Sequence, residues 1–190
     1  MALGDVAPFH RFARLYDLGM YRADPETLQV GLDRADGPVE LVLDVGGGTG
    51  RASRALSGPR TVVVDAARGM LREARGHGLE TVQGDAATLP IGDGAADAIV
   101  IVDALHHMAD VDGVFAAAHR ALRPGGVLVV REFDPTTLRG RGLVLGERIV
   151  GFDSHFYPPD DLRDRLTSAG FDATVPDRGF GYTVAAVADK

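Results

Sequence analysis

The sequence of 190 residues contains no cysteine. Without a thiol the chain forms no disulfide, binds no metal through thiolate and uses no cysteine nucleophile. Lysine is almost absent as well, since Lys190 stands alone beside 19 arginines, and 21 Asp outnumber six Glu. This skew indicates either a GC-rich genome or adaptation to a salty cytosol.

Positive charge and long apolar runs are also scarce. The 20 basic side chains are outnumbered by 27 acidic ones, which gives a formal net charge of −7. This balance argues against a nucleic-acid-binding surface. No segment approaches the roughly 20 apolar residues of a membrane span, and residues 1–5 lack the basic start of a secretory signal. We therefore expect a soluble, cytoplasmic protein with no integral membrane segment.

What the chain does contain is a regular alternation of β-branched runs with helix-like stretches between about residues 40 and 133. This alternation is typical of βαβ units and a parallel sheet. Because the runs are continuously apolar, the strands should be buried on both faces. The five strands are expected at residues 41–45, 61–65, 79–83, 98–102 and 127–130.

Helices are expected between and around these strands. The segments are residues 9–20, 25–35, 51–57, 66–76, 111–122 and 158–169. The helix ending at residue 122 should stop there because Pro124 and Gly125 cannot continue it. Residues 135–157 look less regular. The last two strands are expected at residues 171–175 and 180–188, joined by a turn at 176–179.

A glycine-rich loop follows the first expected strand, in Asp44-Val45-Gly46-Gly47-Gly48-Thr49-Gly50. Glycine lets a ligand approach the backbone closely, and ligands of open α/β sheets bind at the carboxyl ends of strands. The dinucleotide fingerprint fits poorly, because its last glycine position falls on Arg51 or Ser53. A nicotinamide oxidoreductase, in which Arg51 meets a phosphate, and a simple turn both remain alternatives.

Two acidic residues end the next two strands. Asp65 lies 21 residues after Asp44, where a carboxylate can accept both hydroxyls of a ribose. Asp85 follows the third strand, and its alternative role is a helix N-cap. Because parallel strands end at one edge of a sheet, we expect both carboxylates beside the glycine loop.

These motifs occur in a characteristic order and spacing. They are Asp44 to Gly50, Asp65, Gly84-Asp85-Ala86, Asp97–Val102 into Asp103-Ala104-Leu105-His106-His107, and Leu122-Arg123-Pro124-Gly125-Gly126. Over about residues 40–133 the chain resembles the class I S-adenosylmethionine-dependent methyltransferases, and residues 156–171 extend the likeness. It is most similar to the methyltransferase type 11 branch, which includes ubiquinone and menaquinone C-methyltransferases.

The resemblance implies an α/β fold: a doubly wound, Rossmann-like, mostly parallel seven-stranded sheet with an antiparallel C-terminal strand and helices on both faces. It also implies S-adenosylmethionine as cofactor and S-adenosylhomocysteine as product. The implied cofactor-binding residues are Asp44, Gly46, Gly47, Gly48, Thr49, Gly50, Asp65, Ala66, Met70, Asp85, Ala86 and Asp103. In this scheme Asp65 would bind the ribose hydroxyls, and Ala66 and Met70 would flank the adenine ring. Asp85 and Ala86 would bind the edge of that ring, and Asp103 would face the reacting end of the cofactor.

Candidates for the acceptor side follow the fourth and fifth strands. His107, the preferred one, and His106 could remove a proton from the acceptor or orient it. The alternative is that one histidine packs structurally and the other is solvated. Tyr16 and Arg131, with Glu132 beside it, are further candidates, although surface or packing roles are the more ordinary ones. No spacing predicts a metal site.

The domain organisation follows from these assignments. We expect one methyltransferase domain over residues 1–190. Its parts are a helical cap (1–38), a cofactor-binding core (39–133), a cover of the substrate site (134–157) and a C-terminal helix with strands (158–190). The apolar cover with a few arginines suits a hydrophobic or partly anionic small molecule, such as a quinone precursor.

Three functions remain to be distinguished. The first is methyl transfer to a small-molecule acceptor by a monomer or homodimer that binds no nucleic acid. The second is a regulatory or partner protein that binds S-adenosylmethionine or S-adenosylhomocysteine without catalysis. The third is the nicotinamide oxidoreductase, which the absence of a paired catalytic Tyr and Lys makes weak.

Overall fold

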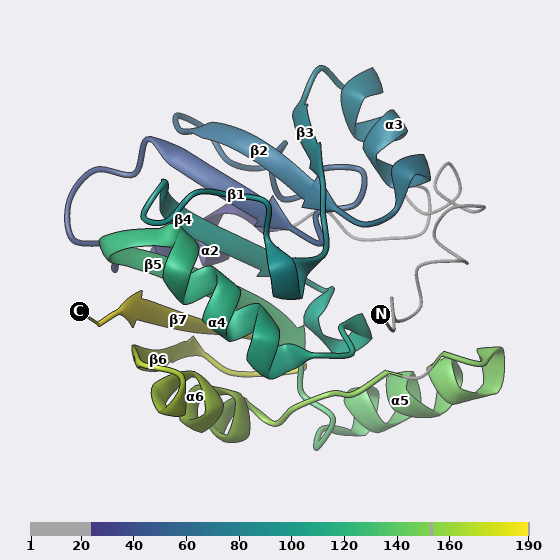
Figure 1. Ribbon diagram of the computed structural model, residues 1–190. Helices are drawn as coiled ribbons and strands as arrows, with labels where there is room; N and C mark the ends of the chain where they lie inside the picture. The colour runs from purple at the N-terminus through teal and green to yellow at the C-terminus, as the bar shows by residue number, and fades with distance from the viewer. Residues whose placement is uncertain (1–23, 153, 190) are drawn as a thin grey trace.

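A seven-stranded sheet forms the centre of the molecule (Figure 1). The computed structural model describes residues 24–152 and 154–189. The strand order is β3-β2-β1-β4-β5-β7-β6. The strands are β1 (Leu41–Val45), β2 (Arg60–Asp65), β3 (Glu80–Gln83), β4 (Ala96–Val102), β5 (Leu122–Phe133), β6 (Phe171–Asp177) and β7 (Gly181–Ala188).

The pairing of the strands confirms the expected doubly wound fold. Strands β1 to β5 are mutually parallel, whereas β7 is antiparallel to both β5 and β6. The order of the parallel strands reverses between β1 and β4, and such a reversal opens a crevice at the carboxyl ends of the strands. The expected site residues therefore lie where an open α/β sheet binds ligands.

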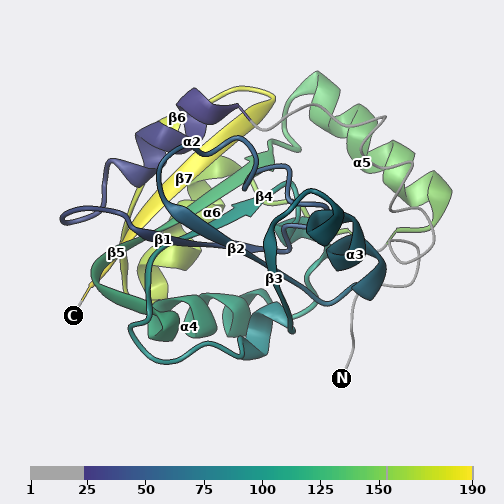
Figure 2. The ribbon, with the colours of Figure 1, turned by 90° about the horizontal axis from the view of Figure 1, so that it is seen from above.

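Helices cover both faces of the sheet (Figure 2). They are α2 (Pro25–Leu32), α3 (Arg68–Gly76), α4 (Val111–Ala121) and α6 (Pro159–Ser168), whereas α5 (Leu138–Val150) lies beside the sheet and is mostly exposed. Alternate residues of β1 show the two faces: Val42 packs in a cluster with Leu28 of α2, whereas Leu43 packs with Phe115 of α4 and Leu162 of α6. Two apolar layers thus hold the sheet rigid beneath the loops at its edge.

One expected helix is absent. Residues 51–55 form turns rather than a helix, and residues 56 and 57 have no regular structure. The backbone N–H of Ser53 donates to the Asp44 carboxylate at 3.0 Å, which holds this segment against the end of β1. Only isolated helical bonds remain, such as that from Arg54 N to the Gly50 carbonyl at 3.0 Å.

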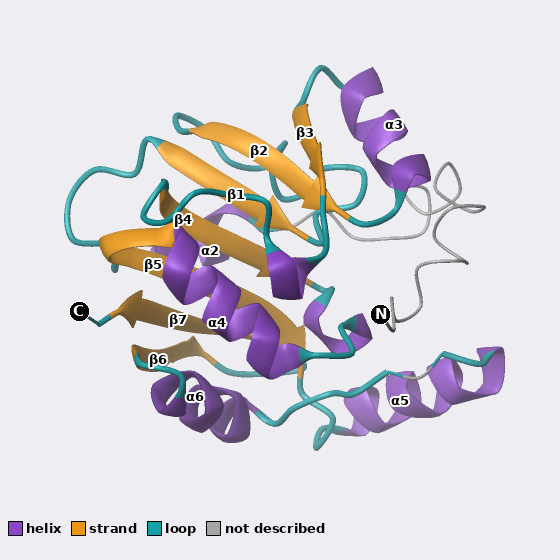
Figure 3. Ribbon diagram, viewed as in Figure 1, coloured by secondary structure: helices purple, strands orange, loops and turns teal. Residues whose placement is uncertain are grey.

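One helix was not expected. Residues 135–157 were predicted to be irregular, but α5 occupies the middle of this segment. The Thr137 hydroxyl caps its start by accepting from the Gly140 N–H, and Gly151 ends it in the left-handed conformation, with φ of 87°. Helix α5 extends past the carboxyl ends of the parallel strands (Figure 3).

The other boundaries differ from expectation by a few residues. Helix α4 ends before Pro124, as predicted, whereas β5 begins at once and is much longer than residues 127–130. Strand β6 continues into the turn expected at residues 176–179. The helix expected at residues 9–20 lies outside the described residues. Among the described residues, no helix combines the length and hydrophobicity that crossing a bilayer requires.

Candidate functional site

The glycine loop at the end of β1 leaves the backbone of Gly48 open to a ligand. Gly48 has φ of 58°, and a Cβ placed on it would approach only the Met70 sulfur, at 3.8 Å. A Cβ on Gly47 would instead lie 2.6 Å from Oδ1 of Asp44. Glycine is required at Gly47 for packing and at Gly48 for its backbone conformation, and Gly48 leaves room for a ligand beside Met70.

Asp44 is a fully buried carboxylate beneath this loop. Its Oδ2 accepts hydrogen bonds from the backbone N–H and the hydroxyl of Ser53, at 3.0 and 2.8 Å. Its Oδ1 has no hydrogen-bond partner within the described part of the chain. Burial raises the pKa of Asp44 to about 6. A buried acceptor without a donor is costly, so this oxygen is suited to a cationic or hydrogen-bonding group of a ligand acting through the loop.

Asp65, the last residue of β2, ties the loop to helix α3. Its Oδ2 accepts from the Gly48 N–H at 2.9 Å, and its Oδ1 accepts from the Ala67 N–H at 2.7 Å. Ala66 follows directly, and Met70 is buried in the first turns of α3. The loop, Asp65, Ala66 and Met70 therefore come together as the sequence predicted.

Asp85 lies at the end of the neighbouring strand. Its Oδ1 accepts from the Ala87 N–H at 2.9 Å and caps the 3-10 helix Ala86–Thr88. The N-cap interpretation of Asp85 is therefore confirmed as a local contact. The Gly84 N–H donates to the Asp65 carbonyl at 3.2 Å, which holds the ends of β2 and β3 together.

Asp103 occupies a strained position after β4. Its φ of 51° is the one positive value at a described residue other than glycine, and such strain is typical of functional sites. Arg51 and Arg131 flank its carboxylate at 3.5 and 3.3 Å. Burial raises the pKa of Asp103, and the two guanidinium groups oppose the rise. Arg51, which the nicotinamide alternative placed against a phosphate, thus forms an ion pair with Asp103, and Arg131 forms an ion pair with the same carboxylate.

His106 is the centre of a buried polar cluster. It lies in the 3-10 helix Leu105–His107, and its Nδ1 is 2.8 Å from Oε2 of Glu132. Its Nε2 is 3.7 Å from Oε1 of Glu147 on α5, and its ring stacks on Phe156 at 4.3 Å. Burial lowers the pKa of His106, but the carboxylates of Glu132, Glu147 and Asp103 together outweigh it, so the pKa is raised.

His107 has the opposite electrostatic environment. Its Nδ1 lies 3.2 Å from the Ser154 hydroxyl, and its ring centre is 5.3 Å from that of Phe152. Burial, and then the charge of His106, lower the pKa of His107 to about 3. His107 is therefore neutral at physiological pH and suited to orienting or hydrogen-bonding a ligand.

The two halves of the site touch. A Cβ on Gly46 would lie 2.9 Å from Cε of Met108 and 3.0 Å from Cβ of Ala104, which places the glycine loop against the segment that carries Asp103 and both histidines. Of the predicted residues, only Tyr16 lies outside the described residues.

Glu147 and Ser154 lie at the site but were not predicted from the sequence. Glu147 belongs to the segment that was expected to be irregular, so nothing indicated which way its side chain would point. The signal that could have found it was the pair of caps, Thr137 and Gly151, which define α5. With the helix in place, Glu147 falls on the same side of α5 as Gly140, the buried residue of this helix.

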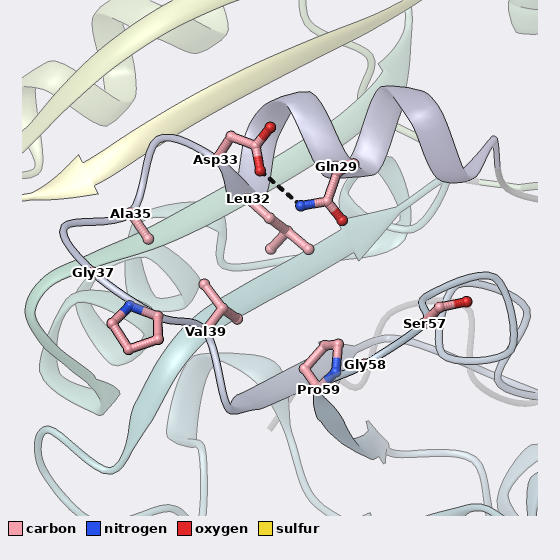
Figure 4. A pocket seen from close by; sticks show the side chains of 10 residues that line it. Gln29, Leu32, Asp33, Ala35, Gly37, Val39, Ser57, Gly58 and Pro59 are labelled. Carbon is pink, nitrogen blue, oxygen red and sulfur yellow. Dashed lines mark hydrogen bonds between the residues drawn. The ribbon is translucent and has the colours of Figure 1, made fainter.

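A separate pocket of about 520 Å³ lies at the opposite edge of the sheet, before β1 and β2 begin (Figure 4). It is lined by Gln29, Leu32, Asp33, Ala35, Gly37, Pro38, Val39, Ser57, Gly58 and Pro59. Its one ionisable side chain, Asp33, accepts a hydrogen bond from Gln29 at 2.7 Å. None of the predicted site residues lines this pocket, so it does not compete with the carboxyl edge as the candidate site.

Comparisons with known proteins identify relatives of the chain. A family model described as "Methyltransferase domain" matches residues 43–130. A demethylmenaquinone methyltransferase of Thermus thermophilus is 31% identical over 218 aligned positions, which cover 98% of each chain. A malonyl-[acyl-carrier protein] O-methyltransferase of Xylella fastidiosa is 41% identical over 107 residues, 52% of this chain. That match spans only 36% of the Xylella protein.

A solved structure shares the fold. The S-adenosylmethionine-dependent methyltransferase of Thermotoga maritima superposes with a TM-score of 0.78 at 21% identity, over 94% of this chain and 97% of that one. At this identity the likeness is evidence of fold alone.

Proposed function

Because the chain belongs to the family of S-adenosylmethionine-dependent methyltransferases, we propose that it transfers the methyl group of S-adenosylmethionine to a small hydrophobic acceptor, such as a quinone precursor. The observation that carries the proposal is the set of groups around the glycine loop: Oδ1 of Asp44, which has no hydrogen-bond partner among the described residues, the open backbone at Gly48 and the carboxylate of Asp65.

Each part of the cofactor is assigned to residues of this site in the proposal. Oδ1 of Asp44 would act through the loop on the amino group of the methionine portion, and Gly46 to Gly50 would pass along that portion. Asp65 would accept the ribose hydroxyls, with its Oδ2 exchanging the Gly48 N–H for a ligand hydroxyl. Met70 and Ala66 would flank the adenine, with Asp85 and Ala86 at its edge. Asp103 would face the reacting end.

The cofactor supplies a methyl group on a good leaving group, so the protein has mainly to align the acceptor. Holding two reactants in an attack geometry is worth about 7 to 11 kcal/mol of barrier. The aromatic rings around the histidine pair suit a planar acceptor: Phe156 stacks on His106, Phe152 lies beside His107, and Phe133 is 6.4 Å from His106 between ring centres.

Proton removal from the acceptor is assigned to the histidine pair. Glu132 orients the His106 ring and stabilises its protonated form, the arrangement that a general base requires. His107 stays neutral and would position the acceptor. Arg131 acts on Asp103 and is therefore a positioning residue in this proposal.

The name of the Thermus relative supports a quinone precursor as the acceptor. The rings of Phe156 and Phe152 beside the two histidines support a hydrophobic one. The exposed apolar side chains of α5, among them Leu138 and Leu145, lie on the cover expected over the acceptor site.

The experiment that tests the proposal combines binding with turnover. We expect S-adenosylmethionine and S-adenosylhomocysteine, but not NADH, to bind in calorimetric titration. Asp65→Ala should lower the affinity for S-adenosylhomocysteine by roughly 10- to 100-fold, the loss expected for hydrogen bonds to a charged group. The control variant Asp172→Ala, on β6, should leave this affinity unchanged.

Turnover is then measured with radiolabelled methyl donor and a panel of demethylated quinone precursors. Binding of the adenosyl ligands without methyl transfer to any acceptor would favour the non-catalytic alternative. Unchanged affinity in Asp65→Ala would refute the placement of the ribose.

A further inference from the structure

We propose that His106, His107 and Glu147 bind a divalent transition-metal cation on the acceptor side of the site. One ligand atom from each of these residues can be chosen so that all three lie within 4.8 Å of one another. Two imidazoles and one carboxylate are a set that binds zinc and its neighbours in the first transition row and leaves further coordination positions for another ligand.

The spacing between His106 and Glu147 fits a shared ion better than a direct contact. Nε2 of His106 and Oε1 of Glu147 are 3.7 Å apart, which is too long for a hydrogen bond. Two ligands on one tetrahedral zinc, each about 2.1 Å from the metal, lie roughly 3.4 Å apart. A small movement of the Glu147 side chain would therefore bring both atoms to one ion.

The surrounding hydrogen bonds already orient the ligands. Glu132 holds Nδ1 of His106 at 2.8 Å, which directs Nε2 toward Glu147. A carboxylate on the far nitrogen of a metal-binding histidine is the usual support of such a ligand. The Ser154 hydroxyl lies 3.2 Å from Nδ1 of His107 and restrains that ring.

The charge and the hydrogen bonding of the Glu147 carboxylate both favour a bound cation. Oε2 of Glu147 is buried without a hydrogen-bond partner in the part of the chain that the structure describes. The nearby charge of Asp103 is balanced by Arg51 and Arg131, which leaves the carboxylates of Glu132 and Glu147 facing two imidazoles. A divalent ion would neutralise the pair and occupy the unused lone pairs of Glu147.

The nitrogen ligands select the metal. Imidazole favours zinc, cobalt, nickel or iron, whereas magnesium and calcium prefer sites made of oxygen alone. The role of the ion rests on the proposed function and replaces the histidine base there, because the metal would occupy Nε2 of His106: an acceptor hydroxyl bound to the ion would release its proton to solvent more readily, since a Lewis acid stabilises the resulting oxyanion. No electron is transferred in this step.

The test uses the full chain, freed of metal by a chelator and titrated with Co²⁺. We expect one equivalent to bind, with visible absorption typical of a low-symmetry site, and Zn²⁺ but not Mg²⁺ to displace it. Failure of the wild-type chain to bind one equivalent tightly would overturn the proposal without any variant.

Glu147→Gln keeps the size of the side chain and removes its charge, on a helix that is mostly exposed. We expect this variant to lower the affinity for Co²⁺ about tenfold or more. Glu132→Gln should lower the affinity for Co²⁺ by roughly 10- to 100-fold, as the loss of other carboxylates that support a metal ligand does. His155→Asn removes an exposed imidazole next to the cluster and should bind as the wild type does.

Equal affinity in Glu147→Gln and the wild type would place the ion elsewhere and contradict the site. S-adenosylhomocysteine is titrated into the same samples, because its binding depends on Asp65 and the glycine loop. Binding of S-adenosylhomocysteine without binding of Co²⁺ would refute only the metal site. Binding of Co²⁺ without binding of S-adenosylhomocysteine would refute only the proposed function.

Discussion

At the scale of single residues, the site depends on carboxylates that the fold removes from water. Asp44 is the extreme case, since it is fully buried with one oxygen unpartnered among the described residues, and its pKa is raised to about 6. Ser53 supplies both hydrogen bonds to the other oxygen and limits the rise. The folded chain therefore holds a proton on Asp44 at pH values where the unfolded chain has lost it.

This difference predicts a measurable pH dependence of stability. Between about pH 4 and pH 6 the native state binds more protons at Asp44 than the unfolded state, so this residue's contribution to the unfolding free energy falls as the pH rises. The shift from 3.8 to about 6 corresponds to about 3 kcal/mol. We expect Asp44→Asn to remove this dependence.

The measurement is denaturant unfolding of both chains from pH 4 to pH 7 without cofactor. The stability of Asp44→Asn relative to the wild type should increase across this window. Ser53→Ala serves as the comparison, because losing its hydroxyl should raise the pKa of Asp44 further and extend the fall to higher pH. Parallel curves for Asp44→Asn and the wild type would contradict the assignment.

At the scale of elements, α5 is unusual because most of its surface is exposed. The side chains of Leu138, Leu145, Ile149 and Val150 are 88%, 60%, 76% and 69% exposed. The helix is held at its start, where Gly140 packs against the Asp134 carbonyl. Caps and a single close backbone contact thus position Glu147 next to His106.

The glycines of α5 give a matched pair of variants. A Cβ on Gly140 would overlap the Asp134 carbonyl, whereas one on Gly142 would meet nothing within 4 Å. We expect Gly142→Ala to stabilise the chain by about 0.5 to 1 kcal/mol, through the better helix propensity of alanine. Gly140→Ala should destabilise it and shift the start of α5.

Thermal unfolding and hydrogen exchange of the α5 amides measure these effects. Slower exchange in Gly142→Ala and faster exchange in Gly140→Ala are expected. If both variants behaved alike, the described contact between α5 and Asp134 would be wrong.

At the scale of the whole molecule, the cofactor should stabilise the sheet edge on which it is proposed to bind. A ligand at 100 times its Kd adds about 2.7 kcal/mol to the stability of the native state. For a domain of this size that corresponds to a rise in Tm of about 5 to 10 °C.

Differential scanning fluorimetry with S-adenosylhomocysteine measures this rise, with NADH as the comparison ligand. Asp65→Ala at the same ligand concentration should show a smaller shift. A larger shift with NADH than with S-adenosylhomocysteine would contradict the cofactor assignment.

The sequence by itself determined the parallel sheet, its strand-end acids and the glycine loop. These features are readable because they are local: apolar runs define the buried strands, and parallel strands must all end at one edge. That Asp65 would lie beside Gly48 follows from topology alone, and the structure places its Oδ2 2.9 Å from the Gly48 N–H.

Tertiary structure decided everything that depends on contacts across the chain. Residues 51–55 form turns, and the buried Asp44 carboxylate accepts from both the N–H and the hydroxyl of Ser53 in this segment. His106 has a raised pKa and His107 a lowered one, although they are adjacent in sequence, because the Glu132 carboxylate lies 2.8 Å from the His106 ring, whereas burial and the charge of His106 act on His107. Burial and long-range charge set these properties, and neither can be read from local sequence.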